Sequence, residues 1–129
     1  MKTANVAEAV KSEHAVALLK QMYGGNRGEE NAARYQLVAD GFAKEFGDKA
    51  FEFFSAPGRT EIGGNHTDHN HGKVLAGSVH LDCVAAAAPN GTHTVNLISE
   101  TYNQHLVIDL DDLAPTEKTT GTEPLLKGI

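Results

Sequence analysis

The chain has 129 residues, a formal net charge of −6 at pH 7 and one cysteine. Its hydrophobic (40%) and charged (22%) fractions fit one soluble globular domain, and the negative charge argues against nucleic acid as a partner, because phosphate backbones need a basic surface. No apolar run is long enough to span a membrane, and the first residues lack the apolar segment of a signal peptide. We therefore expect a cytoplasmic protein whose Cys83 is a buried, reduced thiol.

Two helices are predicted at the start. Apolar residues recur at helical spacing from Asn5 to Tyr23, where Gly24 ends the pattern, and again from Glu30 to Phe46, where Gly47 ends it. The first stripe comprises Val6, Val10, Leu18, Leu19 and Met22, and the second comprises Tyr35, Val38, Ala39, Phe42 and Phe46. We expect both stripes to pack against a sheet.

Strand patterns follow the helices. A short strand around Phe51 and Phe53 is predicted to run into Pro57, and the alternation from Lys73 to Ala88 predicts a long strand. The apolar face of the long strand is expected to hold Val79, Leu81, Cys83, Ala85 and Ala87. Its alanine-rich end could also be helical by propensity, but the turn signal Pro89-Asn90-Gly91 favours a strand that ends in a hairpin.

Two further strands are predicted, from Thr92 to Ser99 and from Gln104 to Leu110. A polar loop from Asp111 to Thr122 then leads to the start of a helix. Thr122 is expected to cap this helix, and Pro124 fits its first turn.

The predicted fold class is therefore α+β. Leading helices occupy about residues 1–47 and pack on a mostly antiparallel sheet of about residues 50–112, and the start of another helix occupies residues 124–129. We expect these 129 residues to form one domain.

The stretch from Pro57 to Gly72, PGRTEIGGNHTDHNHG, carries the chemistry. One reading is a metal site, because histidine and aspartate are zinc ligands, although neither strand spacing nor helix spacing gathers them all on one face. The ligands on this reading are His66, Asp68, His69 and His71. A phosphate-binding loop is a second reading, but the glycines fit neither common nucleotide-binding fingerprint.

The third reading is a pocket for a polar ligand such as a sugar. The glycine pair before residue 65 allows a sharp turn, and His66, Asp68 and Asn70 offer donors and acceptors for hydroxyl groups. Arg59 adds a cation that can stabilise negative charge on a hydroxyl oxygen or on a phosphoryl group in transfer.

The same stretch resembles the galactokinase signature of the GHMP small-molecule kinases, P-G-R-V-N-L-I-G-E-H-T-D-Y-N-x-G-x-V-L. The positions that match it, without a gap, are Pro57, Gly58, Arg59, Gly64, His66, Thr67, Asp68, Asn70, Gly72, Val74 and Leu75. The resemblance implies that the chain adopts the N-terminal part of the GHMP-kinase fold.

The resemblance also implies an activity: transfer of the γ-phosphate of ATP, with Mg²⁺, to the anomeric hydroxyl of galactose or a related hexose. It implies that Arg59 is catalytic at the reacting hydroxyl and also contacts the sugar, and that Asn65, His66 and Asp68 bind sugar hydroxyls. ATP and Mg²⁺ are expected mainly on parts of the enzyme outside these residues, with no metal or cofactor site within them.

Some positions depart from the signature. Asn65 stands where the family has a glutamate, so the site keeps an acceptor but loses a charge, and Glu61 adds a carboxylate that can pair with Arg59. The sequence also lacks the family's Gly/Ser-rich ATP-phosphate loop, its catalytic aspartate and its C-terminal motif. We therefore expect the N-terminal portion of a longer kinase chain, inactive alone. Two alternatives stay open: a non-catalytic sugar sensor on the same scaffold, and a small metal-binding module.

Overall fold

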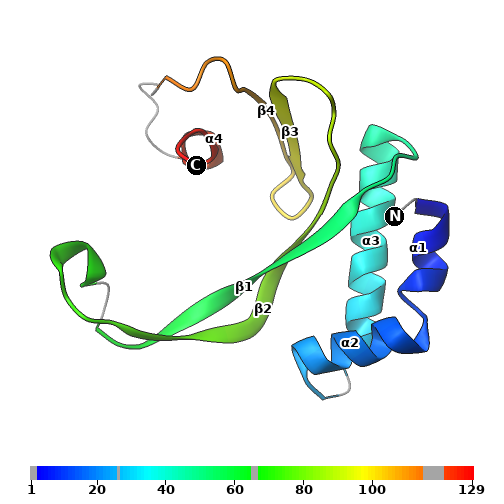
Figure 1. The fold of residues 1–129 in the computed structure, drawn as a ribbon, viewed down its shortest axis with the longest axis horizontal. Coiled ribbons are helices and arrows are strands. Elements are labelled where there is room, and N and C mark those ends of the chain that lie inside the picture. The colour runs from blue at the N-terminus through cyan, green and yellow to red at the C-terminus, as the bar shows by residue number, and fades with distance from the viewer. Residues whose placement is uncertain (1–2, 26, 65–66, 115–120) are drawn as a thin grey trace. The chain divides into compact units, whose positions relative to one another are not determined.

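The structure is a computed structural model that describes residues 3–25, 27–64, 67–114 and 121–129 (Figure 1). Its elements in chain order are α1 (Thr3–Ala9), α2 (Glu13–Tyr23), α3 (Gly28–Phe46), β1 (Glu52–Gly63), η1 (Asp68–Asn70, a 3₁₀ turn), β2 (Leu75–Ala87), β3 (Thr94–Ser99), β4 (Gln104–Asp109) and α4 (Thr122–Lys127). They form two compact units, Met1–Pro89 and Asn90–Ile129. Within the described ranges, no helix is both long and apolar enough to cross a membrane.

The single helix expected from Asn5 to Tyr23 is wrong, because the chain forms α1 and α2 with a break at Ser12. The Ser12 hydroxyl oxygen accepts a hydrogen bond from the Ala15 N–H at 3.2 Å and donates one to the Ala9 carbonyl at 2.7 Å. A serine that bonds the backbone in this way begins a new helix instead of continuing the old one.

The break at Ser12 changes which residues of the first apolar stripe are buried, while the second stripe is confirmed. Leu19 is buried as expected, but Leu18 and Met22, which lie after the break, are exposed. In α3, which begins two residues before the predicted start, Tyr35 and Phe42 are both buried. The helix ends are also confirmed, because Gly24 and Gly47 terminate α2 and α3 with positive φ angles of 72° and 78°.

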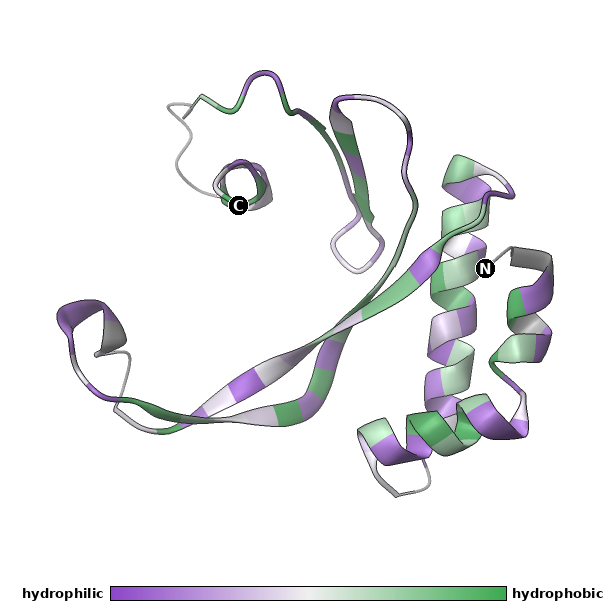
Figure 2. Cartoon of the chain, in the orientation of Figure 1, coloured by the Kyte–Doolittle hydropathy of each residue, from purple (hydrophilic) through white to green (hydrophobic). Residues whose placement is uncertain are grey.

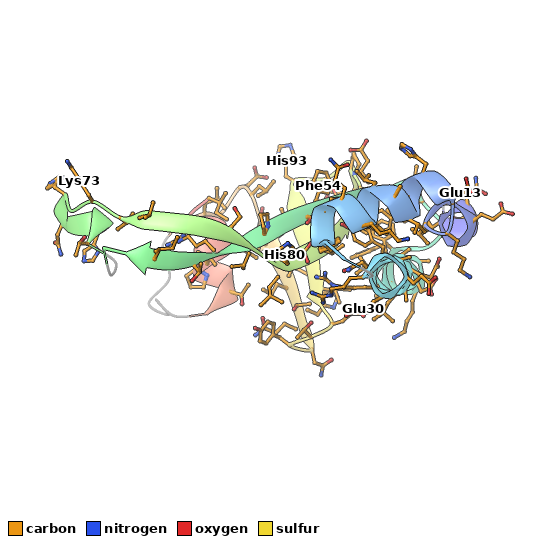
Figure 3. All side chains as sticks on the ribbon, turned by 90° about the horizontal axis from the view of Figure 1, so that it is seen from below. Glu13, Glu30, Phe54, Lys73, His80 and His93 are labelled. Carbon is orange, nitrogen blue, oxygen red and sulfur yellow. The ribbon has the colours of Figure 1, made fainter. Side chains whose placement is uncertain are left out.

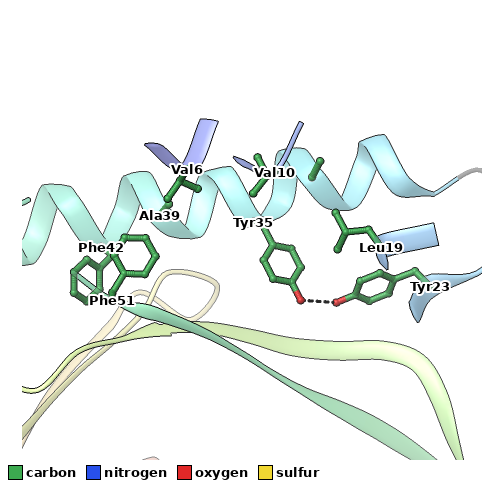
Figure 4. Packing of buried hydrophobic residues seen from close by; sticks show 9 residues of the cluster. Val6, Val10, Leu19, Tyr23, Tyr35, Ala39, Phe42 and Phe51 are labelled. Atoms are coloured by element: carbon green, nitrogen blue, oxygen red, sulfur yellow. Dashed lines mark hydrogen bonds between the residues drawn. The ribbon is translucent and has the colours of Figure 1, made fainter. Parts of the chain in front are cut away.

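The core of the first unit lies between the helices and one end of the sheet (Figure 4). Its buried members are Val6, Val10, Leu19, Tyr23, Ala32, Tyr35, Ala39, Phe42 and Phe51. The ring centroids of Phe42 and Phe51 lie 4.8 Å apart, and those of Tyr35 and Phe53 lie 5.0 Å apart. Such aromatic pairs contribute about 0.5–1.5 kcal/mol each beyond the area they bury, so they help to hold α3 against the start of the hairpin.

The sheet of this unit is a long antiparallel hairpin of β1 and β2. The expectation that the first strand ends near Pro57 is wrong, because β1 continues to Gly63. The register shifts between Pro57 and Arg59, where the pairing that couples Pro57 with Asp82 gives way to one that couples Arg59 with Ser78. The expectation that the alanine-rich end of β2 is a strand is confirmed.

From Leu81 onward, the buried face of β2 is the opposite of the predicted one, whereas Val79 is partly buried as expected. Val84 and Ala86 pack against the core, whereas Leu81 is 71% exposed and Cys83 is exposed, so the expected buried thiol is also wrong. Figure 2 shows apolar and polar residues mixed along both strands of the hairpin. Both faces of β2 carry apolar residues, so alternation separates the two faces without telling which one the helices cover.

The second unit contains the hairpin of β3 and β4 and the short helix α4. Both strands are confirmed, and Asn103 makes the turn between them with a φ of 48°. Pro89-Asn90-Gly91 is not a hairpin turn, because β2 pairs with β1 and not with β3. Thr122 is not the helix cap: its hydroxyl donates to the Gln104 side chain at 3.0 Å. The α+β class with antiparallel pairing is confirmed, in two small sheets.

Candidate functional site

The signature stretch occupies the outer half of the β1–β2 hairpin. It begins at Pro57 in the middle of β1, passes through η1 and enters β2 at Leu75. Figure 3 shows Lys73 at the far end of this hairpin, while α2 and α3 lie at the other end. The candidate site is therefore carried on an arm that extends from the helical core.

The loop at the end of the arm is closed by its own backbone. The Thr67 carbonyl accepts hydrogen bonds from the N–H groups of Asn70 at 3.0 Å and Gly72 at 2.8 Å, and the Thr67 N–H donates to the Gly64 carbonyl at 3.1 Å. Gly64 has a φ of 102°, and a Cβ atom there would lie 2.5 Å from the Lys73 carbonyl oxygen. Glycine at position 64 is thus required by both the backbone angle and the close approach of the returning chain.

The structure places only part of the predicted sugar-binding set. Arg59 is described in full, and the backbone of Asp68 begins η1. Asn65 and His66, and the side chain of Asp68, lie outside the described residues. Their expected convergence on a sugar therefore stays a prediction.

Arg59 lies in β1 with its side chain 65% exposed. Its Nη2 atom is 3.8 Å from Oε1 of Glu61, whose side chain is largely buried. This contact confirms the pairing expected from the sequence. An ion pair this exposed adds little to stability, but it can orient the guanidinium.

The metal reading finds no support in the described part of the loop. His69 and His71 are exposed, and the Nε2 atom of His69 lies 3.1 Å from the side-chain nitrogen of Asn70. His71 adopts a left-handed backbone with a φ of 63°. No group of three His, Cys, Asp or Glu side chains gathers among the residues described.

A second polar cluster, which the sequence reasoning missed, lies where the arm leaves the core. The Asp82 side chain is only 3% exposed and accepts hydrogen bonds from Arg34, Ser55 and Tyr23, each at 2.5 Å. Tyr23 also bonds the hydroxyl of Tyr35 at 3.1 Å. The sequence did contain a sign of this cluster, namely an aspartate within an apolar strand. A carboxylate buried there needs hydrogen-bond partners.

The cluster stabilises the ionised form of Asp82. Burial acts to raise the pKa of Asp82, but hydrogen bonds from Ser55, Tyr23 and Arg34, with the charge of Arg34, outweigh it, so the pKa lies below the usual 3.8. Burial and the bond to Asp82 raise the pKa of Tyr23 well above its ordinary value. A neutral Tyr23 therefore donates to a charged Asp82.

The comparisons with known proteins show what this stretch of the chain is similar to. A protein-family model described as the galactokinase galactose-binding signature matches residues 40–89, which include the whole β1–β2 hairpin. Over this stretch the chain is therefore similar to a signature of a kinase family. That family is the galactokinases, and the resemblance expected from the sequence is confirmed.

Individual galactokinases show the same similarity. That of Lactococcus lactis subsp. cremoris is 37% identical over 87 residues, covering 65% of this chain and 22% of the relative. That of Lactococcus lactis subsp. lactis is 36% identical over 93 residues, covering 71% and 23%. That of Lacticaseibacillus paracasei is 36% identical over 73 residues, covering 57% and 19%. The similarity thus spans about a fifth of the relatives' length, and no solved structure matches the chain at a significant level.

Proposed function

We propose that these 129 residues are the sugar-binding part of an ATP-dependent galactokinase that converts galactose to galactose 1-phosphate. The match of the galactose-binding signature to residues 40–89 is the observation that supports this proposal. Because the similarity covers only 22–23% of two galactokinases, the proposal assigns the remaining machinery to other parts of a longer chain. A cytoplasmic location belongs to the same proposal.

Arg59 carries the chemistry in this proposal. Removal of a proton from the anomeric hydroxyl puts negative charge on its oxygen, which attacks the γ-phosphorus of ATP while the bond from phosphorus to the bridging oxygen breaks and ADP leaves with the charge. A guanidinium held beside the anomeric oxygen stabilises the charge as it develops, and Glu61, 3.8 Å from the guanidinium, limits the orientations it can take. Arg59 is thus proposed to act on the reacting hydroxyl.

The other proposed sugar contacts are carried over from the signature, position by position. The Asp68 carboxylate accepts hydrogen bonds from hydroxyl groups, and the His66 imidazole accepts or donates one. Asn65 offers an amide where the signature has a carboxylate. An amide accepts more weakly than a carboxylate, so we expect the affinity for the sugar to depend less on this position. ATP supplies the phosphoryl group and Mg²⁺ neutralises its charge, both bound mainly outside the described residues.

The test uses the complete protein that contains this sequence. Galactose 1-phosphate formation is followed by phosphorus NMR for the wild type, Arg59→Ala and Arg59→Lys. We expect Arg59→Ala to lower kcat by about 10²-fold with a smaller rise in KM, and Arg59→Lys to restore it only in part, because a point charge cannot replace the planar fork.

Arg27→Ala is the matched control, because Arg27 is also an exposed arginine paired with a glutamate, Glu30, but lies before α3. It should leave kcat unchanged. Galactose binding without turnover in the wild type would favour the sensor alternative, and an unchanged kcat in Arg59→Ala would remove Arg59 from the mechanism.

A further inference from the structure

Asp82 lies at the point where the pairing of β1 and β2 is interrupted. It is the register partner of Pro57, the first residue of the signature. The next pair along the hairpin is Arg59 with Ser78, so three residues of β2 face the single residue Gly58. The strands are therefore out of regular register just before the arginine of the site.

The backbone cannot secure this point by itself. Pro57 has no N–H to donate across to β2. Gly58 lies so close to β2 that a Cβ atom there would be 3.2 Å from both the Leu81 carbonyl oxygen and a methyl group of Val79. Main-chain pairing is thus interrupted where the arm begins, so side chains are needed to fix the two strands there.

The Asp82 carboxylate supplies that connection. Its Oδ2 accepts from Ser55 of β1, two residues before Pro57, and from Tyr23 at the end of α2. Its Oδ1 accepts from Arg34 of α3, which also donates to the Asp82 carbonyl at 2.7 Å. One buried side chain therefore joins β2 to β1 and to two helices.

We propose that Asp82 is a positioning residue of the sugar site, which fixes β1 against β2 and the helices so that the arm holds Arg59 in one place. The role given to Arg59 rests on the proposed function, whereas the positioning itself is a property of the fold. Neutralising the carboxylate leaves Arg34 without its anionic partner and releases the strand at Ser55.

The kinetic test compares Asp82→Asn with two controls in the complete protein. Asp40→Asn makes the same chemical change on the exposed side of α3, where Asp40 accepts only a helical bond from Gln36 among the contacts described. Phe42→Leu removes core packing without touching the cluster. Activity is measured well below the melting temperature of every variant. We expect kcat to fall about tenfold in Asp82→Asn, with a smaller change in KM, and to stay unchanged in both controls.

A double variant separates positioning from general damage. If Asp82 acts through Arg59, Asp82→Asn adds little to the loss already caused by Arg59→Ala. Fully additive losses would overturn the proposal, and so would an equal loss of kcat in Phe42→Leu.

A second measurement does not depend on kinase activity. Hydrogen exchange by mass spectrometry should quicken about fivefold or more in a peptide that covers residues 58–63 of Asp82→Asn, while a peptide from the second half of α3 keeps its wild-type rate. Unchanged exchange in residues 58–63 would overturn the positioning role. An inactive wild type with the expected exchange would instead overturn the proposed function and leave the positioning role standing.

Discussion

The hydroxyl of Tyr23, at the end of α2, donates to the buried carboxylate of Asp82, 59 positions later in the chain. Because Tyr23 gives its hydrogen to Asp82, Tyr35 is the donor in the bond between the two tyrosines. The contact connects a helix formed from local sequence to a strand that follows the signature loop. It is a long-range contact whose loss can be measured by removing one oxygen atom.

Tyr23→Phe removes that oxygen while keeping the ring in the core. We expect the free energy of unfolding to fall by about 1.5–3 kcal/mol, because a hydrogen bond to a charged, buried acceptor is lost. Urea unfolding followed by circular dichroism measures the change. Tyr102→Phe is the control, since Tyr102 is exposed, and it should leave the unfolding curve in place. Equal effects of the two changes would contradict the role of the Tyr23 hydroxyl.

Stability should depend on pH through Asp82. Its pKa in the folded protein is lowered below the unfolded value, so the stabilisation is complete above the unfolded pKa and is lost as the pH falls through the lower folded pKa. The free energy of unfolding, measured at pH 7, 5 and 3, should therefore be lower at pH 3 than at pH 7. This decrease should be smaller in Asp82→Asn than in the wild type. Asp40→Asn serves as the control, because it makes the same chemical change at an exposed position of α3. If the free energy of unfolding of Asp82→Asn fell at pH 3 as much as that of the wild type, this assignment would be contradicted.

The two neighbouring glycines of the loop should respond differently to an added methyl group. Gly64→Ala places a Cβ against the Lys73 carbonyl at a positive φ, whereas a Cβ at Gly63 meets nothing within 4 Å. We expect Gly64→Ala to weaken galactose binding about tenfold or more in the complete protein, and Gly63→Ala to bind nearly as the wild type does. Isothermal titration calorimetry checks this, with melting curves to confirm that both variants fold. Equal affinities would show that the loop tolerates the clash.

Single substitutions in the loop separate a sugar site from a metal site. On the sugar proposal, Asp68→Ala costs about 1–3 kcal/mol of galactose binding, because hydroxyl groups lose a partner, and His71→Ala is nearly silent. On the metal reading, His66, His69 and His71 matter equally, because each loss opens the coordination sphere. Calorimetry on the single variants, with and without a chelator, distinguishes the two. Equal losses at the three histidines together with chelator sensitivity would refute the sugar pocket.

The sequence predicted those features that depend on local pattern. The stripe of α3 follows from helical spacing, and the signature was recognisable because its residues are contiguous in sequence. The break at Ser12 was not predictable from spacing, because a serine is compatible with both a helix interior and a cap, and only its bonds to Ala9 and Ala15 decide.

Features that depend on long-range packing were missed. Alternation along β2 could not show that Val84 faces the helices and Cys83 faces away, since both are apolar and occur on opposite faces. Nor could it find the cluster at Asp82, whose partners come from three distant segments. Of the candidate site, the sequence predicted the Arg59–Glu61 contact, which lies within one strand.

The order of the segments bears on how the protein is made. Every member of the hydrophobic core cluster lies between Val6 and Ala88, so the first unit can fold while the residues that follow are still being synthesised. At that stage the nascent chain displays the exposed side chains of Phe54 and Leu81 on the β1–β2 hairpin. Slow translation after β2 has left the ribosome would prolong this state, and a chaperone that binds apolar strands would then protect the nascent chain from aggregation.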